Sequence, residues 1–224
     1  MTRSILLDTE TTGLDPALGH RVIEIAAIEL SNDLPTGRFF HRLLNPERSV
    51  PAEATAIHGL RDTDLIGKPR FAEVTQDFLA FLGLDPIIAH NAPFDFSFLD
   101  SELLRCGEAR LARARMIDTL ALAKSLFPGA TNTLDALCRR FAISLAERSR
   151  HNALLDCRLL AAVYVELTGG RQRGLALERA TGVPRECVVG THNHTPYRMA
   201  PNADEQAKHI AFITRFKAPL WQKD

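Results

Sequence analysis

The stretch from Ser4 to Leu14 constrains the fold and the chemistry of this chain more than any other. It opens with an unbroken apolar run at residues 5–7, which predicts a strand buried on both faces. Asp8 and Glu10 follow directly, and alternate residues of a strand point to the same side. Two like charges about 6–7 Å apart repel unless a cation lies between them. The stretch therefore predicts either a cation-binding pair at the carboxyl end of a core strand or an acidic surface turn.

Composition is that of an ordinary globular protein and excludes a strongly charged chain. The 224 residues suffice for one sizeable α/β domain with a tail, and 46% of them are hydrophobic. Lys+Arg and Asp+Glu are both 27, so no overall basic field holds a long duplex, and a nucleic-acid substrate would be gripped locally. No C-x-x-C pair, signal peptide or long apolar run is present. We therefore expect a cytoplasmic protein without membrane contact.

The first third of the chain predicts an antiparallel meander. The β-branched run from Val22 to Leu30 and the run from Phe39 to Leu44 predict two further strands, with a turn cluster at residues 32–37 between them. Short loops favour antiparallel neighbours because parallel strands need a longer crossover. A short helix is expected from Pro51 to Leu60, and an apolar stripe from Phe71 to Phe81 marks a longer one.

Strands and helices alternate in the region that follows. Short apolar runs at residues 86–90 and 116–117 predict two strands, which helical crossovers place parallel to the first strand. Helices are predicted over residues 98–103, 119–127, 132–141 and 153–167. The predicted fold class is therefore α/β: a mixed sheet, made of a three-strand antiparallel meander and parallel strands, is flanked by helices and followed by a C-terminal tail.

A third carboxylate is expected at the same edge of the sheet. Asp95 follows the short strand at 86–90, so in a parallel sheet it emerges beside Asp8 and Glu10. Taken alone, Asp95 also suits the first turn of a helix, where the dipole favours a negative charge. Three acidic side chains at one edge favour the binding of a cation.

A histidine and a fourth carboxylate accompany the last long helix. His151 and Asp156 are five residues apart, which on one ideal helix separates them by roughly 140°. They converge only if His151 lies outside the helix, and Asn152 is a suitable N-cap that places it there. The alternative is a solvent-exposed loop histidine without a role in the chemistry.

This set of residues suits hydrolysis of a phosphodiester. The reaction needs a hydroxide nucleophile and neutralised charge on the attacking and leaving oxygens, which two divalent cations about 3.5–4 Å apart supply. Carboxylate and water oxygens are the ligands that Mg²⁺ and Mn²⁺ prefer. As a loop histidine that can move toward a substrate, His151 suits the general base that takes the proton from the attacking water.

Together the motifs resemble the DEDD exonucleases of the histidine type, which have a ribonuclease H-like fold. The motifs are Asp8-Thr-Glu10, His90-Asn-Ala-Pro-Phe-Asp95 and His151-Asn-Ala-Leu-Leu-Asp156. The similarity extends from residue 3 to Gly170 and is strongest to the group of proofreading epsilon subunits of bacterial DNA polymerase III. Residues 125–129, 133–138 and 168–170 also match that group.

The resemblance implies 3′→5′ hydrolysis of DNA that releases nucleoside 5′-monophosphates, with His151 as general base. Two divalent cations, Mg²⁺ or Mn²⁺, are then held by the four carboxylates Asp8, Glu10, Asp95 and Asp156. The 3′ end of single-stranded DNA is expected to contact three of these and two residues of the predicted short helix: Asp8, Glu10, Asp156, Glu53 and His58. From the residues alone, the last two would belong to a solvated helix face.

The sequence changes character after Gly170. Gln172, Leu175 and Leu177 resemble the peptides with which replication proteins dock into the sliding clamp, through apolar anchors in a preformed pocket. Residues 181–200 are rich in Gly, Pro, His and Asn, a composition typical of a flexible linker.

The last segment combines a capped helix with an apolar face that one short segment cannot bury alone. The resemblance implies that it docks on the polymerase (alpha) subunit through Phe212, Phe216 and Trp221, whereas docking back onto the N-terminal domain is the alternative. We therefore expect three regions: an exonuclease domain at 1–170, a clamp-binding peptide and linker at 171–201, and a polymerase-binding segment at 202–224.

Three functions are compatible with these features. The first is a proofreading exonuclease subunit of a replicative polymerase. The second is a free-standing exonuclease that trims RNA or single-stranded DNA, and the clamp-like peptide and apolar tail argue against it. The third is an inactive scaffold that bridges clamp and polymerase, and the complete set of four carboxylates and one histidine argues against it.

Overall fold

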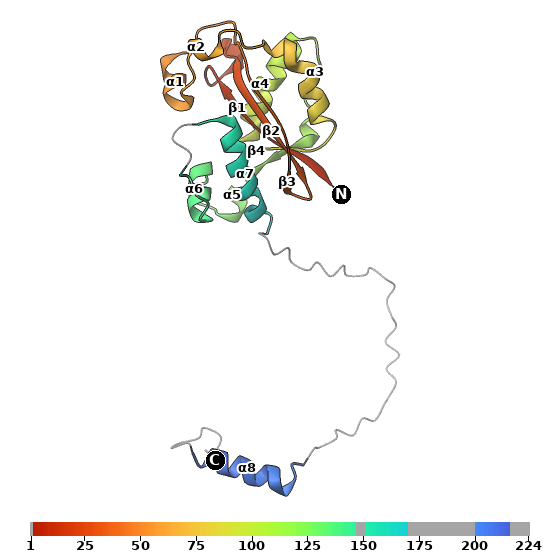
Figure 1. Cartoon of the computed structure of the whole chain (residues 1–224), viewed down its shortest axis with the longest axis vertical. Coiled ribbons are helices and arrows are strands. Elements are labelled where there is room, and N and C mark those ends of the chain that lie inside the picture. The colour runs from red at the N-terminus through yellow and green to blue at the C-terminus, as the bar shows by residue number, and fades with distance from the viewer. Residues whose placement is uncertain (1, 147–150, 170–199, 216–224) are drawn as a thin grey trace, which may run out of the picture. The chain divides into compact units, whose positions relative to one another are not determined.

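The strand that carries the predicted cation-binding pair, β1 (Arg3–Thr11), lies at the centre of a five-stranded sheet with the order β3-β2-β1-β4-β5 (Figure 1). β2 (Val22–Ser31) pairs antiparallel with β1 and with β3 (Leu34–Leu43). β4 (Ile87–Ala89) and β5 (Met116–Asp118) continue the sheet on the other side of β1 in parallel. The predicted mixed sheet is confirmed.

The computed structural model describes residues 2–146, 151–169 and 200–215. The chain divides into two units, Met1–Ala176 and Leu177–Asp224. The predicted boundaries after residues 170 and 201 fall within or beside segments outside the described residues, so the three predicted regions stay predictions.

The strands extend further than predicted at two places. β1 continues through Thr11, because its pairing with β2 passes an irregularity after Glu10, opposite Glu24, and resumes with Thr11 opposite Val22. The turn predicted at 32–37 is wrong, since only Asn32 and Asp33 form it, both with positive φ, and β3 begins directly after them. Two residues in this conformation make the tight hairpin turn that matches the twist of the flanking strands.

Seven α-helices and two 3₁₀ turns complete the described part of the N-terminal unit. They are η1 (Pro16–Leu18), α1 (Ala52–His58), α2 (Asp62–Leu65), α3 (Phe71–Leu82), α4 (Ala92–Arg105), η2 (Arg113–Arg115), α5 (Thr119–Leu126), α6 (Leu134–Arg140) and α7 (Ala153–Leu167). The predicted helices are present with ends shifted by a few residues, whereas α2, a single turn, was not predicted.

The two faces of the sheet are covered by different helices (Figure 1). On one face, α7 packs on a row that includes Leu6 and Ile88. On the other, α3 and α4 pack on a row that includes Leu7. Since side chains alternate along a strand, Asp8 continues the row facing α7 and Thr9 the row facing α4. The carboxyl end of β1 therefore presents polar groups to the first turns of both helices.

The described part of the C-terminal unit is a single helix, α8 (Ala203–Ile213). Asn202 caps it as predicted and forms a reciprocal capping box with Glu205. No residue of α8 is buried, and Ile210 and Phe212 are 61% and 54% exposed. Within the described ranges, none of the helices has the length and apolar character needed to cross a membrane.

Candidate active site

Asp8 and Glu10 start the site from β1. Glu10 is 9% exposed, and Asp8 is half-buried. Their positions two apart on a regular strand place both on the α7 face, and the bulge that follows Glu10 ends the regular pairing just after them. The sheet thus delivers two carboxylates to one place with no flexible segment between them.

Asp95 reaches the same edge from α4. It is the fourth residue of that helix and only 3% exposed, and its Oδ1 accepts a hydrogen bond of 2.8 Å from Thr9 Oγ1. The helix begins at Asn91, whose φ of 67° is left-handed and whose side chain does not cap it. Instead, Asp118 at the end of β5 accepts hydrogen bonds from the backbone N–H groups of Asn91 and Ala92. The start of α4 is therefore fixed by neighbouring strands.

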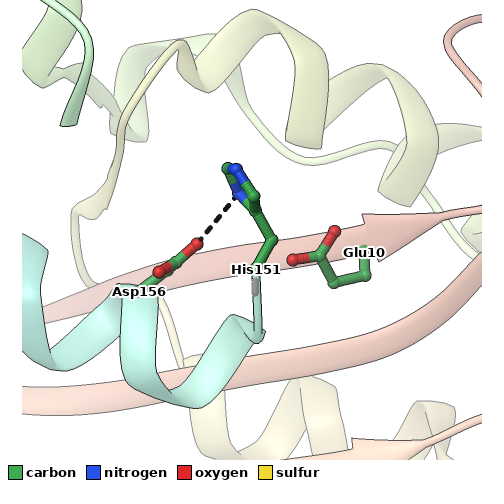
Figure 2. A group of neighbouring side chains, drawn as sticks. All are labelled: Glu10, His151 and Asp156. Atoms are coloured by element: carbon green, nitrogen blue, oxygen red, sulfur yellow. Dashed lines mark ion pairs between the residues drawn. The ribbon is translucent and has the colours of Figure 1, made fainter. Parts of the chain in front are cut away.

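His151 and Asp156 come from the start of α7. Asn152 is the N-cap, and its side chain accepts a hydrogen bond from the N–H of Leu155, so the predicted cap is confirmed and His151 lies outside the helix. His151 Nδ1 lies 3.3 Å from Asp156 Oδ2 (Figure 2). The histidine side chain is 50% exposed, whereas that of Asp156 is 4% exposed. The ring thus contacts Asp156 and is half-exposed to solvent.

The geometry brings ligand atoms of Glu10 together with those of His151 and Asp156, which lie about 140 residues later in the sequence. Atoms of Glu10, His151 and Asp156 all lie within 4.8 Å of one another, which is close enough to share one ion (Figure 2). In this cluster His151 could itself be a ligand, an arrangement that the sequence did not predict. Aspartate and glutamate oxygens are the donors that hard divalent cations prefer, so the residues fit such an ion.

Electrostatics also favours a cation here. Burial, followed by the charges of Asp95, Glu10 and Asp156, raises the pKa of Asp8 well above its usual value. Burial likewise raises the pKa of Asp95 to about 7, although the hydrogen bond from Thr9 opposes this. Carboxyl groups that repel one another in a poorly solvated place hold protons unless a positive ion replaces them.

Two cavities open on either side of these carboxylates. Cavity A, about 510 Å³, is bordered by Glu10 and by apolar side chains of the loop after β1, of α1 and of α4: Leu14, Leu18, Ile57 and Phe94. Cavity B, about 490 Å³, is bordered by Asp8, Asp156 and His151 and by polar residues that include His90, Asn91 and Thr133. Cavity A is thus mainly apolar, whereas cavity B is the more polar of the two and includes charged side chains.

A family model described as an exonuclease matches residues 5–164. The DNA polymerase III subunit epsilon of Rickettsia conorii is 46% identical over 220 residues, which cover 95% of this chain and 96% of that protein. The same subunit of Escherichia coli K12 is 43% identical over 178 residues, 76% of this chain and 73% of the relative. The chain belongs to the DNA polymerase III epsilon family of exonucleases. The predicted family is confirmed.

Solved structures of exonucleases have the same fold. Exonuclease X in complex with 5′ overhanging duplex DNA superposes with a TM-score of 0.58 and 26% identity, over 74% of this chain and 90% of that one. The zinc-bound complex of Escherichia coli exonuclease I with single-stranded DNA gives a TM-score of 0.66 at 20% identity, over 77% of this chain and 41% of that one, and supports the fold alone. Enzymes of the epsilon type are metal-dependent, in keeping with the carboxylate cluster.

The two helix residues predicted to contact the substrate border cavity A in this epsilon-family chain. Glu53 is exposed on α1, whereas His58 is only 6% exposed, so the solvated face expected from the residues alone is wrong for His58. His58 Nδ1 accepts a hydrogen bond from the N–H of Leu60, and its Nε2 is buried without a partner among the described residues. Burial lowers the pKa of His58, which favours the neutral ring.

Several residues of this epsilon-family site were not singled out from the sequence. Thr9 lies between the two predicted ligands. Side chains alternate along a strand, so the sequence could have shown that Thr9 faces the other side of the sheet, where it binds Asp95. Leu14, Leu18 and Ile57 are exposed at cavity A, but a lone exposed apolar residue carries no signal in a sequence.

Other predicted residues lie in the C-terminal unit or outside the described residues. Phe212 is on α8, in the C-terminal unit. The predicted clamp-binding and remaining polymerase-binding residues, Gln172, Leu175, Leu177, Phe216 and Trp221, lie outside the described ranges. Their roles stay predictions.

Proposed function

We propose that this protein is a 3′→5′ exodeoxyribonuclease that acts in the cytoplasm as the proofreading epsilon subunit of a replicative DNA polymerase. The observation that carries the proposal is the convergence of acidic residues from three motifs: Glu10 lies beside His151 and Asp156, and Asp95 binds Thr9 and acts on the charge of Asp8. The high similarity to epsilon subunits along nearly the whole chain supports the same conclusion.

The residues would act on the phosphodiester as follows. Asp8, Glu10, Asp95 and Asp156 would hold two Mg²⁺ or Mn²⁺ ions, which when bound supply charge neutralisation and an acidified water. His151 would take the proton of the attacking water, and its half-exposed ring is accessible for this transfer. Asp156 would orient the ring through the contact at Nδ1.

Cavity A suits the terminal nucleotide of a DNA 3′ end. Its apolar side chains can pack against a base whatever its identity, because every base has a flat apolar face. The unpartnered Nε2 of His58 and the carboxylate of Glu53 are polar groups that a sugar or phosphate could engage. Such contacts would accept any base, as removal of a mismatched nucleotide requires.

Digestion of a labelled primer tests this function. A primer with a mismatched 3′ end, annealed or single-stranded, should be shortened one nucleotide at a time in Mg²⁺, and EDTA should stop the reaction. Addition of the cognate polymerase should increase the rate on the annealed primer. Digestion from the 5′ end, or none at all in Mg²⁺ and Mn²⁺, would contradict the proposal.

The polymerase subunit is the partner proposed for residues 202–224. Fully burying residues such as Ile210 and Phe212, which α8 exposes, contributes about 1.5–3 kcal/mol each before the cost of ordering them. Deleting 202–224 should abolish co-purification with the polymerase and leave digestion of free single strands unchanged. If the truncated protein still co-purifies with the polymerase, or if its exonuclease domain becomes less stable, the segment packs on the exonuclease domain and the proposal is contradicted.

The sliding clamp is the partner proposed for the peptide at 172–177. Replacement of Gln172, Leu175 and Leu177 by Ala should weaken clamp association and leave hydrolysis of free single strands unchanged. Unchanged clamp affinity would assign these residues to the domain or to the linker.

A free-standing exonuclease that trims RNA or single-stranded DNA is the second candidate. A free-standing exonuclease would use the same site, so it would hydrolyse free single strands just as a proofreading subunit does. The two differ in the response to the polymerase and in the preference for deoxyribose, and parallel digestion of DNA and RNA strands of one sequence separates them.

A further inference from the structure

Glu24 is a buried acidic residue that the reaction described above does not use. It lies in β2, opposite Glu10 in the strand register, and its side chain is 1% exposed. A buried carboxylate needs hydrogen-bond donors, and Glu24 has three. Two of them belong to the start of α7, the helix that carries Asp156.

The start of α7 is tied to β2 by both oxygens of Glu24. Oε1 accepts a hydrogen bond of 2.9 Å from Asn152 Nδ2, and Oε2 accepts one of 3.3 Å from the N–H of Ala153. His41 on β3 contributes the third contact, with Nε2 at 2.7 Å from Oε1. A negative charge at this end of a helix also meets the positive pole of the helix dipole.

Asn152 has two functions at once. Its Oδ1 caps the helix by accepting from the N–H of Leu155, while its Nδ2 donates to Glu24. The amide cannot turn over without losing one of the two bonds, since only its oxygen accepts and only its nitrogen donates. The residue before it is His151, whose N–H donates to Ile57 O on the other side. The histidine is therefore held between α1 and the Glu24 contact.

We infer that Glu24 is a positioning residue for hydrolysis, which acts through Asn152 to set the distance of His151 and Asp156 from the carboxylates of β1. The inference rests on the proposed function. Glu24 and Glu10 are opposite one another on adjacent strands, so the sheet that fixes Glu10 also fixes the anchor of α7. Strand pairing thereby sets the spacing of site residues that come from distant parts of the sequence. Misplacement by about 1 Å can cost about 10²-fold in rate.

Glu24→Gln is the sharpest single change because it keeps the size of the side chain. The glutamine amide group offers one acceptor where the carboxylate offers two, so its nitrogen would face either Asn152 Nδ2 or the N–H of Ala153. We expect kcat on a short single strand to fall by about 10–10²-fold, with a smaller change in KM. Half-saturation by Mn²⁺ should change less than kcat, because all four carboxylates remain and only the position of Asp156 is altered.

The swap Glu24→Gln with Asn152→Asp is the rescue. An aspartate caps a helix as well as asparagine and can accept a hydrogen bond from the glutamine nitrogen, so the tie is rebuilt with donor and acceptor exchanged. The total charge of the site is unchanged. We expect the double variant to recover most of the kcat lost in Glu24→Gln, and Asn152→Asp alone to be impaired because two carboxylates then face each other.

Glu29→Gln is the matched control in the same strand. Glu29 is also buried and receives hydrogen bonds from Arg3, Thr36 and Arg38, none of which borders either cavity. Its replacement should lower the melting temperature and leave kcat unchanged. If Glu24 were purely structural, Glu24→Gln would likewise lower the melting temperature and leave kcat unchanged.

The outcomes separate this inference from the proposed function. If the unmodified chain fails to shorten a DNA 3′ end, the function and this inference both fall. If it is active and Glu24→Gln keeps full kcat, or the double variant shows no recovery, the inference alone is overturned. Loss of kcat in Glu24→Gln, recovery in the swap and full kcat in Glu29→Gln would establish it.

Discussion

The two helices that supply the candidate site, α4 and α7, begin in similar ways, but their aspartates have different surroundings. Each places an aspartate at its fourth residue, Asp95 in one and Asp156 in the other. Each also has N-terminal N–H groups bound by a carboxylate of a neighbouring strand, which is Asp118 for α4 and Glu24 for α7. The two helices differ in what contacts these aspartates.

Asp95 is fixed by its surroundings, whereas Asp156 contacts a residue that is open to solvent. Thr9 binds Asp95 from β1, and the side chain is buried. Asp156 contacts His151, whose side chain is half-exposed at cavity B. Under the proposed function, α4 would supply a metal ligand that is already fixed in place, and α7 would supply a ligand together with a histidine that can exchange protons with water.

The largest effect should come from removing the charge of either aspartate. Asp95→Asn and Asp156→Asn should each lower hydrolysis by about 10³-fold or more, since ligands of a catalytic ion contribute several kcal/mol to the transition state. Single-turnover rates on a short DNA strand measure this. Asp100→Asn, a buried α4 residue that binds Arg113 away from both carboxylates, is the control and should keep its activity. Near-normal turnover of either site variant at limiting Mg²⁺ would contradict the assignment.

His151→Ala tests whether α7, unlike α4, is accompanied by a general base. It should lower the rate by about 10²–10⁴-fold, the usual contribution of a general base, and leave Mn²⁺ binding intact. Single-turnover rates and a Mn²⁺ titration of the same protein check both parts. Because a ring nitrogen of His151 also lies within reach of a shared ion, lost Mn²⁺ binding would make His151 a ligand and overturn its role as base.

The stability of the metal-free protein should depend on pH through Asp95. Its folded pKa of about 7 lies above the unfolded value of 3.8, so between these pH values the folded state binds more protons. Stability is therefore highest at low pH for this group and falls as pH rises toward 7, by an amount on the order of 4 kcal/mol. The raised pKa of Asp8 acts in the same direction.

Melting temperatures from pH 4 to 8 in EDTA check this dependence. Asp95→Asn should flatten the slope, and saturating Mn²⁺ should reverse it, because the ion favours the ionised carboxylates. A melting temperature that rises steadily from pH 4 to 7 without metal would contradict the pKa raised by burial.

The smallest expected effect concerns the bond that fixes Asp95. Thr9→Val removes the hydroxyl without changing the shape, which costs about 0.5–1.5 kcal/mol for a lost hydrogen bond. Because that bond lowers the pKa of Asp95, its loss should raise the pKa further and shift the acid limb of the pH–rate profile upward. Thr75→Val, which removes a buried hydroxyl bound to Phe71 O on α3, is the control and should leave the profile unchanged.

Local sequence rules predicted most of the elements, because buried strands and capped helices leave short-range signals. The meander, the parallel strands and the N-cap at Asn152 follow from such patterns. The start of β3 could not be predicted in this way, since Leu34 to Gly37 has turn-like composition and becomes a strand only by pairing with β2.

The charged residues that line the candidate site could be picked out from the sequence, whereas a residue that positions other residues, such as Glu24, could not. Asp8, Glu10 and Asp156 stand out as acids next to strand or helix signals. Glu24 also interrupts an apolar run, but its partners Asn152 and Ala153 are 128 and 129 residues away. Only the fold makes that contact visible.

The central place of β1 has a consequence for synthesis of the protein. Its antiparallel partner β2 follows at once, but its parallel partner β4 begins at residue 87, and α7, which covers one face, ends at Leu167. Contacts so distant in sequence form late, because a long loop must close first. A chain emerging from the ribosome therefore acquires its sheet step by step. Under the proposed function it also lacks two of the five proposed reactive groups, His151 and Asp156, until α7 has left the tunnel, so we expect a partly made chain to be inactive.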